Sequence, residues 1–221
     1  MGGAALLDLE DHYDENGFCT GYKLDDSGNW VNDSCTEEGC TGYQPADLNS
    51  AGQYEIGNAG QLYWFAGLIN GTLAGVSQDT SANAVLTADI TVNEDVVVNG
   101  ALNTGKTFRV WNPIGPCNQK TIDIYFEGIF DGQGHTVSGL YFNDAAGMYV
   151  GMFGQSRGTL QNITVAGSYF SAGKCLGGLV GYSENGTITN CSSLSNMIEG
   201  TNQYVGGIVG QFYSSLKQVK L

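Results

Sequence analysis

A short glycine-rich block recurs through the second half of the chain, and this recurrence constrains the fold more than any other feature. The block is GLVG at 178–181 and GIVG at 207–210, with related versions GIFDG at 128–132 and GMFGQ at 151–155. Aligned on their first glycine, the four copies follow one another at similar distances along the chain. A catalytic loop has no reason to be copied along a chain, whereas the units of a stacked architecture recur at a nearly constant period.

A second block recurs in step with the first. It is HTVSGLYF at 135–142, GTLQNITV at 158–165 and GTITNCSS at 186–193, with a similar spacing between copies. Periods of roughly 20–30 residues, with short strands separated by Gly and Asn, indicate a solenoid of parallel strands, because one such unit cannot bury a face alone. We expect apolar side chains to stack from coil to coil inside it, at Ile188 and in three pairs: Leu140 with Ile163, Leu179 with Ile208, and Val180 with Val209.

One helix signal precedes the repeats, at 58–70. Four apolar residues there fall at i, i+3, i+4 and i+7, which places them on one helical face: Leu62, Phe65, Ala66 and Ile69. Asn58 is suited to the N-cap and Gly71 to the C-terminal stop. Because an open solenoid end exposes unpaired strand edges, we predict that this helix caps the N-terminal end of the solenoid.

The chain divides into three zones. Residues 1–48 form an acidic leader segment with three of the six cysteines, 49–75 contain the capping helix, and 76–221 form the solenoid. After Gly210 the sequence does not continue the second block, which predicts a solenoid truncated at its C-end. A coil without a cap has free strand edges, so we expect end-to-end self-association through the C-terminal coil.

Glycine is unusually frequent, with 34 residues, about twice the usual share. The chain also has 12 Tyr, 9 Phe and 3 Trp but only 3 Pro, which is atypical of a disordered Gly-rich segment. The composition therefore predicts a folded chain with glycine at tight turns where φ is positive.

Acidic residues dominate the charge: 22 Asp and Glu against 8 Lys and Arg, a formal net charge of −14. Phosphate contacts need clustered basic residues, so we expect no nucleic-acid partner. No stretch approaches the roughly 20 apolar residues of a membrane-spanning helix, so we expect no membrane insertion. The N-terminus lacks the basic region of an intact signal peptide, but the repeat composition favours an extracellular or cell-surface location.

The series GGLVG, GTITNC and GGIVG resembles the GLUG motif, a short repeat of bacterial surface and secreted proteins, some of them adhesin-like. The resemblance covers about 54–210, with its strongest matches at 177–181 and 206–210 and a weaker one at 151–154. It implies a right-handed parallel β-helix and says little about chemistry, because the motif is structural. Eight glycines are the structural repeat residues that it implies: Gly151, Gly154, Gly177, Gly178, Gly181, Gly206, Gly207 and Gly210.

The candidate catalytic stretch is DGQGH at 131–135. Glycosidic cleavage needs two carboxyl groups roughly 5–9.5 Å apart across the bond. In the alignment above, glycines stand at the positions equivalent to Asp131, so the repeats supply no second carboxylate. Asp-Gly-x-Gly is also a common turn sequence. We therefore predict no catalytic residue and no enzyme activity.

Two functions remain as hypotheses. The first is a non-catalytic, secreted or cell-surface β-solenoid module, an adhesin-like scaffold that binds a host or environmental glycan or protein. The alternative is a carbohydrate-active β-helix enzyme of glycoside hydrolase or polysaccharide lyase type. They differ in whether one lateral groove gathers two or more carboxylates within reach of each other.

Candidate ligand contacts are four tyrosines of the repeat region, since flat aromatic rings can bind sugars: Tyr141, Tyr169, Tyr182 and Tyr204. Ordinary packing at coil corners is the alternative for these rings. Asn162 and Asn190 occupy equivalent repeat positions, which favours an asparagine ladder between coils over glycosylation.

The leader segment offers a candidate structural zinc site of the Cys₃His type, with the residues His12, Cys19, Cys35 and Cys40. Its spacing is not that of a standard zinc knuckle. A disulfide, either Cys35–Cys40 or Cys19–Cys40, and free thiols are the alternatives. No other cofactor is expected.

Overall fold

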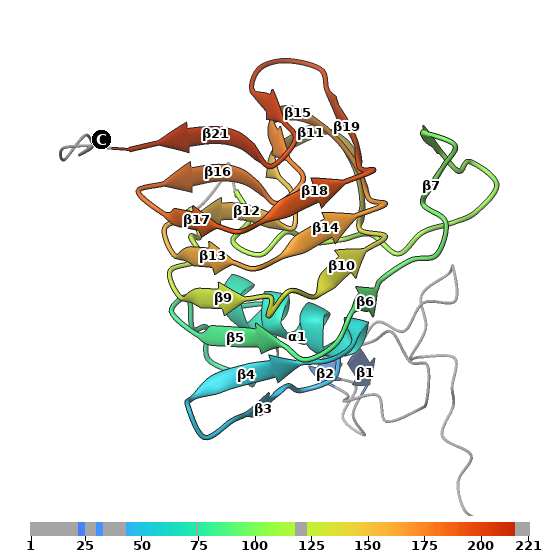
Figure 1. Cartoon of the computed structure of the whole chain (residues 1–221). Coiled ribbons are helices and arrows are strands. Elements are labelled where there is room, and N and C mark those ends of the chain that lie inside the picture. The colour runs from blue at the N-terminus through green and yellow to red at the C-terminus, as the bar shows by residue number, and fades with distance from the viewer. Residues whose placement is uncertain (1–21, 25–29, 33–42, 74, 118–122, 215–221) are drawn as a thin grey trace, which may run out of the picture.

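The protein is a parallel β-solenoid of about 6 turns, as Figure 1 shows. The computed structural model describes residues 22–24, 30–32, 43–73, 75–117 and 123–214. The parallel β-solenoid expected from the repeats is confirmed. A separate antiparallel hairpin of β1 (Tyr22–Leu24) and β2 (Trp30–Asn32) precedes it.

Four sheets form the wall of the solenoid. The first contains β3 (Asp47–Leu48), β4 (Gln53–Ile56), β5 (Asn83–Leu86), β9 (Ile129–Asp131), β13 (Thr159–Gln161) and β17 (Thr187–Thr189). The second contains β6 (Ile90–Thr91), β10 (Thr136–Ser138), β14 (Thr164–Ala166) and β18 (Ser192–Leu194). All of these strands pair in parallel except β3, which joins β4 antiparallel at the N-terminal edge.

The other two sheets contain three of the four glycine-rich blocks, and GIFDG lies in β9 of the first sheet. The third has β11 (Tyr141–Val150), β15 (Tyr169–Gly177), β19 (Met197–Gly200) and β20 (Val205–Gly206), and the fourth has β12 (Phe153–Ser156), β16 (Val180–Glu184) and β21 (Val209–Tyr213). A hairpin of β7 (Val97–Val98) and β8 (Ala101–Leu102) projects from the wall as an arm (Figure 1).

The strand register fixes the length of each coil. Tyr141 lies beside Tyr169, and Tyr169 lies beside Met197, so the same length of chain separates each pair. Val180 lies beside Val209, as the sequence predicts, with nearly the same length of chain between them. The coils are therefore nearly equal in length, and equivalent side chains form columns along the solenoid.

The register corrects two alignments made from the sequence. Phe130 of GIFDG pairs with Leu160 and not with Phe153 of GMFGQ. Val137 pairs with Val165, so HTVSG is equivalent to 163–167 and not to 158–162. Each coil contains more than one Gly-apolar stretch. A match between short sequence patterns therefore could not tell which strand of one coil is equivalent to which strand of the next. The same error misplaced Leu140, whose N–H donates to Ser168 Oγ at 3.0 Å, one strand away from the predicted partner.

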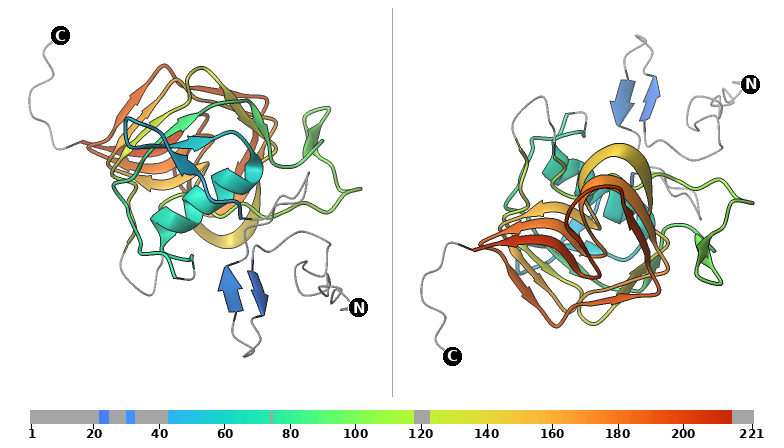
Figure 2. Two further views of the ribbon diagram at one scale, coloured as in Figure 1. Left: turned by 90° about the horizontal axis from the view of Figure 1, so that it is seen from below. Right: turned by 90° about the horizontal axis from the view of Figure 1, so that it is seen from above.

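The predicted helix is confirmed as α1 (Ala59–Asn70). The Asn58 side chain accepts a hydrogen bond from the Gln61 N–H at 2.9 Å, and Gly71 ends the helix in the left-handed conformation with φ of 68°. Helix α1 lies across the N-terminal end of the solenoid, as the left panel of Figure 2 shows. It is buried on nearly all sides rather than on the one predicted face, and outside that face Tyr43 packs against Tyr63 and Tyr54 against Trp64.

Aromatic rings connect this cap to the interior. The Phe65 ring lies 5.8 Å from that of Phe130, which lies 5.3 Å from that of Phe153. All three side chains are fully buried, and each buried ring of this size contributes about 1.5–3 kcal/mol through removal of its surface from water. The cap and the first repeat coils therefore share one core. The core already includes β4, so the solenoid wall begins before the residue 76 that composition suggested.

Seven of the eight motif glycines serve close backbone approach, and Gly207 in the last described coil is the exception. None of the eight has φ in the left-handed region. The glycines with positive φ that the composition predicted lie elsewhere in the chain, for example at Gly71 and Gly139. A Cβ added at Gly151 would lie 2.5 Å from the Gly177 carbonyl oxygen, and one added at Gly210 would lie 2.6 Å from the Leu176 nitrogen. Among the non-glycine residues described, four asparagines have φ in the left-handed region, among them Asn162 and Asn190.

The last coil is more exposed than the coils beneath it. Leu179 is fully buried, whereas Ile208, its equivalent one coil later, is 36% exposed. In the described part of the chain, β17, β18, β19 and β21 each pair on one side only. The wall is thus covered at its N-terminal end and open at the last described coil.

Candidate ligand-binding face

Arg157 organises a cluster of charged and aromatic side chains on the outside of the wall. It directly follows β12, and its backbone N–H donates to the Phe126 carbonyl oxygen at 2.8 Å. We use the term lateral cluster for six residues that come from neighbouring coils and the segment before β9: Tyr125, Glu127, Tyr149, Arg157, Tyr182 and Glu184.

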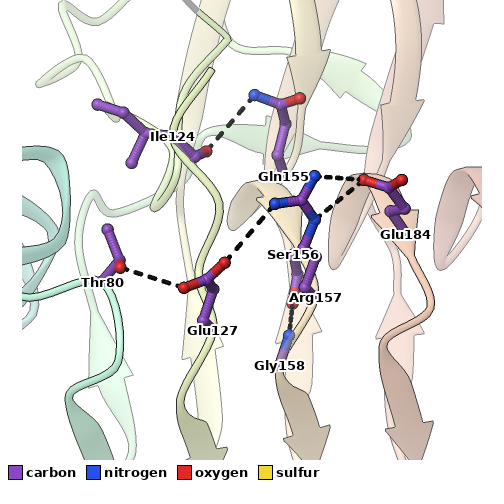
Figure 3. Close-up of polar contacts among 8 residues, drawn as sticks. All are labelled: Thr80, Ile124, Glu127, Gln155, Ser156, Arg157, Gly158 and Glu184. Atoms are coloured by element: carbon purple, nitrogen blue, oxygen red, sulfur yellow. Dashed lines mark hydrogen bonds and ion pairs between the residues drawn. The ribbon is translucent and has the colours of Figure 1, made fainter. Parts of the chain in front are cut away.

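Two carboxylates lie on either side of the Arg157 guanidinium, as Figure 3 shows. Its Nη2 and Nε donate to Glu184 Oε2 at 2.7 and 3.0 Å, and its Nη1 lies 3.6 Å from Glu127 Oε1. The hydrogen bond to Glu184 raises the pKa of Arg157 above its ordinary value. The guanidinium is therefore positively charged at all working pH values and compensates the two carboxylates in part.

Tyrosine rings extend the lateral cluster. The guanidinium carbon of Arg157 lies 3.6 Å from the centre of the Tyr125 ring, within the range of a cation–π contact. The ring centres of Tyr149 and Tyr182 are 5.1 Å apart, and Tyr125 meets Tyr182 edge-on at 6.4 Å. Partial burial raises the pKa of Tyr125 to about 12 and also raises those of Tyr149 and Tyr182. These phenols are neutral near pH 7 and can both donate and accept hydrogen bonds.

A pocket of about 460 Å³ adjoins the lateral cluster. Its walls are the segment 113–117 and the bulged part of β11, where the register with β15 shifts between Asp144 and Met148. Tyr149 lines this pocket and also contacts Tyr182. Pocket and lateral cluster are thus adjacent parts of one surface, with an apolar wall at one end and charged groups at the other.

The backbone of Tyr149 is in the left-handed region, with φ of 55°. Such a conformation is uncommon for a bulky residue and costs of order 1–3 kcal/mol. Cys175 and Tyr204, which occupy the same register position in the next two coils, have φ of 57° and 66°. The left-handed conformation therefore belongs to this corner of each coil. A tyrosine occupies the corner in two of the three coils, as Tyr149 beside the pocket and as Tyr204.

The structure does not bring the four predicted tyrosines together. Tyr182 belongs to the lateral cluster. Tyr141 and Tyr169 stack at 5.8 Å, and Tyr169 is only 5% exposed with its hydroxyl donating to Glu199 at 2.6 Å. Tyr204 is 48% exposed, with the Lys174 ammonium 5.8 Å from its ring centre. Of the four, Tyr182 alone adjoins the pocket wall.

Tyr125, Arg157 and both glutamates were not singled out from the sequence, and Tyr149 was not among the four candidate tyrosines. One signal was available: Ser156 pairs with Ser183, so Arg157 and Glu184 follow equivalent positions of successive coils with opposite charge. Glu127 follows the equivalent position one coil earlier, because Phe126 forms a parallel bridge with Ser156. Glu127 and Tyr125 lie before β9 and outside the repeated sequence blocks, so the letter pattern alone did not reveal them.

The Asp131 side chain has a structural role, because its carboxylate accepts hydrogen bonds from its own coil and from the next one. Its carboxylate accepts hydrogen bonds from Asn162 Nδ2 at 2.9 Å, Gln161 Nε2 at 2.8 Å and the Gln133 N–H at 2.9 Å. Asn190 donates in turn to Asn162 at 2.8 Å, so the predicted asparagine ladder is present and Asp131 forms its base. Burial alone would raise the pKa of Asp131, but these hydrogen bonds outweigh it and hold the pKa below the ordinary value of 3.8.

The candidate zinc ligands His12, Cys19, Cys35 and Cys40 lie outside the described residues. Within the described part of the chain, no group of three or more His, Cys, Asp or Glu side chains could hold a metal ion. The three cysteines of the solenoid, Cys117, Cys175 and Cys191, are free thiols. Among the helices of the described ranges, none is long and apolar enough to cross a membrane.

Comparison with known proteins places these observations in context. The family model described as "The GLUG motif" matches residues 172–196, which run from β15 to just past the end of β18. A curated relative, halomucin of Haloquadratum walsbyi (strain DSM 16790 / HBSQ001), is 34% identical over 127 residues. The match covers 57% of this chain and about 1% of the length of halomucin.

No solved structure matches the chain. The family match covers positions where the close approach of neighbouring coils requires glycine. Backbone atoms of other coils leave no room for a side chain at Gly177, Gly178 and Gly181. The repeats recognised in the sequence are thus a structural device of the wall, and the chain carries the GLUG motif as one coil of a parallel β-solenoid.

Proposed function

We propose that this protein is a non-catalytic, secreted or cell-surface β-solenoid module, an adhesin-like scaffold that binds glycan through the lateral cluster and its pocket. The observation that carries the proposal is the continuity between Tyr182, Tyr149 and the pocket, with Arg157 and Glu184 at its edge. Partly exposed rings offer apolar faces to a sugar, while phenols, the guanidinium and carboxylates offer hydrogen bonds to its hydroxyls. The GLUG motif and the match to halomucin support a surface location.

The acidic character of the chain limits the kind of glycan. With a net charge of −14 and only 8 basic residues, the module would repel a polyanionic chain over most of its surface. Arg157, the cation of the lateral cluster, already pairs with two carboxylates. A neutral glycan therefore fits this face better than a sulfated or uronate-rich one.

One observation favours the enzyme alternative. Glu127 and Glu184 approach the same guanidinium, so one lateral groove does gather two carboxylates. Their arrangement argues for binding instead, because Arg157 lies between them in the space that a glycosidic bond would need (Figure 3).

A glycan array probed with the intact chain tests the proposal, followed by titration of the strongest neutral glycan. Tyr182→Ala should weaken binding by roughly tenfold or more, as expected for an aromatic residue at the centre of an interface. Ile129→Ala removes a 44% exposed side chain from a different sheet and serves as the control. Equal affinities for both variants and the wild-type chain would refute the assignment of this face.

A further inference from the structure

The pocket beside the lateral cluster has a lining that restricts which part of a glycan can enter it. Most of the lining side chains are apolar, among them Pro113, Pro116, Met148 and Val150. A sugar that bears only hydroxyl groups would give up hydrogen bonds to water against this lining without replacing them. The pocket therefore suits a sugar with an apolar substituent. Its volume of about 460 Å³ lies within the usual range for small-ligand pockets, roughly 300–1,000 Å³.

Asp144 places a carboxylate among these apolar side chains. Of the lining residues that the structure describes, it is the only one with a charged side chain. Its Oδ1 accepts a hydrogen bond from the Ala146 N–H at 2.9 Å, in the bulged part of β11. A carboxylate accepts hydrogen bonds and donates none, so a group that enters the pocket beside Asp144 has to offer it a donor.

Tyr149 supplies a donor in the same pocket. Its phenol is neutral near pH 7, because burial raises its pKa. The thiol of Cys117, which also lines the pocket, is uncharged there as well, since burial and the neighbouring Asp123 raise its pKa to about 11. A phenol is a strong hydrogen-bond donor and a thiol a weak one. The pocket thus combines apolar walls with one carboxylate acceptor and one phenol donor.

We propose that the pocket binds the acetamido group of an N-acetylated hexosamine, an inference that rests on the glycan binding proposed above. The methyl group contacts the apolar lining, the amide N–H donates to Asp144, and the amide carbonyl accepts from the Tyr149 hydroxyl. The sugar ring then lies toward Tyr182, whose ring centre is 5.1 Å from that of Tyr149. Binding of a glycan and selection among glycans therefore use adjoining parts of one face.

Other substituents match the pocket less well. The methyl group of a deoxy sugar offers no donor to Asp144, and an acetyl ester has a carbonyl group but no N–H. Sugar acids that carry an acetamido group are repelled by Asp144 and by the net charge of −14. A free amino sugar offers a positive charge to Asp144, but its ammonium group would lose water against the apolar walls.

Titration of the intact chain with matched sugars tests the inference. The probes are neutral glycans that end in N-acetylglucosamine or N-acetylgalactosamine. Each is compared with the same glycan ending in the parent hexose, glucose or galactose, and in the free amino sugar. We expect at least one N-acetyl form to bind roughly tenfold or more tightly than both of its counterparts, because each counterpart lacks the methyl group or the amide.

Asp144→Asn tests the role of the carboxylate. Asparagine keeps the oxygen that accepts from the Ala146 N–H and replaces the other oxygen by a donor. The affinity for the N-acetyl form should fall by roughly tenfold or more, and that for the matched hexose should change little. Asp79→Asn is the control, since Asp79 lies in the segment before β5 and its Oδ1 likewise accepts from the N–H two residues later, that of Ser81, at 3.0 Å.

The results separate this inference from the proposal on which it rests. If N-acetyl forms and hexoses bind equally and Tyr182→Ala weakens both, the lateral cluster binds glycan and the assignment of the pocket to an acetamido group is wrong. Tighter binding of the free amino sugar would also overturn the inference, as would an Asp144→Asn variant that keeps the preference of the unmodified chain. Absence of binding to every glycan would refute the proposed function itself, and the inference with it.

Discussion

Two glycines at equivalent positions of different coils should respond in opposite ways to the same substitution. Gly151 and Gly207 each open a Gly-apolar-apolar-Gly block, GMFG in one coil and GIVG in another. A Cβ added at Gly151 would lie 2.5 Å from the Gly177 carbonyl oxygen and 3.0 Å from that of Leu179. A Cβ added at Gly207 would have no heavy atom within 4 Å.

The magnitude follows from which atoms must move. At Gly151 the obstructing atoms belong to the backbone of the next coil, so Gly151→Ala has to displace a strand rather than a side chain. Forcing an extra carbon into a packed site costs about 1–3 kcal/mol, and for a chain of this length each kcal/mol lowers Tm by about 2–4 °C. Gly207→Ala should be neutral or raise stability by up to about 1 kcal/mol, because alanine restricts the unfolded chain.

Thermal unfolding followed by circular dichroism, at a protein concentration low enough for the monomer, measures both variants. We expect Tm of Gly151→Ala to fall by about 4–8 °C, corresponding to about 2 kcal/mol, and Tm of Gly207→Ala to stay level or rise slightly. Equal losses in both variants would refute the claim that close approach, rather than turn conformation, requires glycine at these positions.

Three further substitutions test other parts of the fold by the same unfolding measurement. Asn58→Ala removes the N-cap of α1 and should cost about 1 kcal/mol, whereas no loss would mean that the cap is irrelevant to the packed helix. Trp111→Phe removes the indole N–H that donates to Gly151 O and Met152 O, and should cost about 1–3 kcal/mol since both acceptors are buried. Asp131→Asn should destabilise the chain at pH 7 and progressively less in acid. The carboxylate has a lowered pKa, so its contribution is complete above pH 3.8 and disappears as the pH falls through the folded-state pKa; a constant difference across that range would contradict its role as an ionised acceptor.

Local features were predictable from the sequence because few residues decide them. Asn58 and Gly71 delimit α1 as predicted, since capping depends on hydrogen bonds within one turn. The pairing of Asn162 with Asn190 also followed from the sequence, because GTLQN and GTITN are aligned in the true register. Where the blocks repeat cleanly, periodicity alone positions one coil over the next.

Features that depend on how much chain lies between two strands were not predictable. Phe130 was matched to the wrong strand, in β12 rather than β13, because the segment before it departs from the repeat and short patterns fitted two registers. The lateral cluster was missed for the same reason: Glu127 and Tyr125 come from that segment and reach Arg157 through the fold alone. Burial of Tyr169 likewise depends on its neighbours in the next coils, which the tyrosine itself does not reveal.

The central claim is that the lateral cluster binds glycan without cleaving it. The most direct measurement incubates the glycans bound in the array with the intact chain and quantifies new reducing and unsaturated ends over time. The account predicts retained binding with no new chain ends, because Arg157 occupies the space between Glu127 and Glu184. New ends that Glu184→Gln or Glu127→Gln abolishes would contradict it and establish the enzyme alternative.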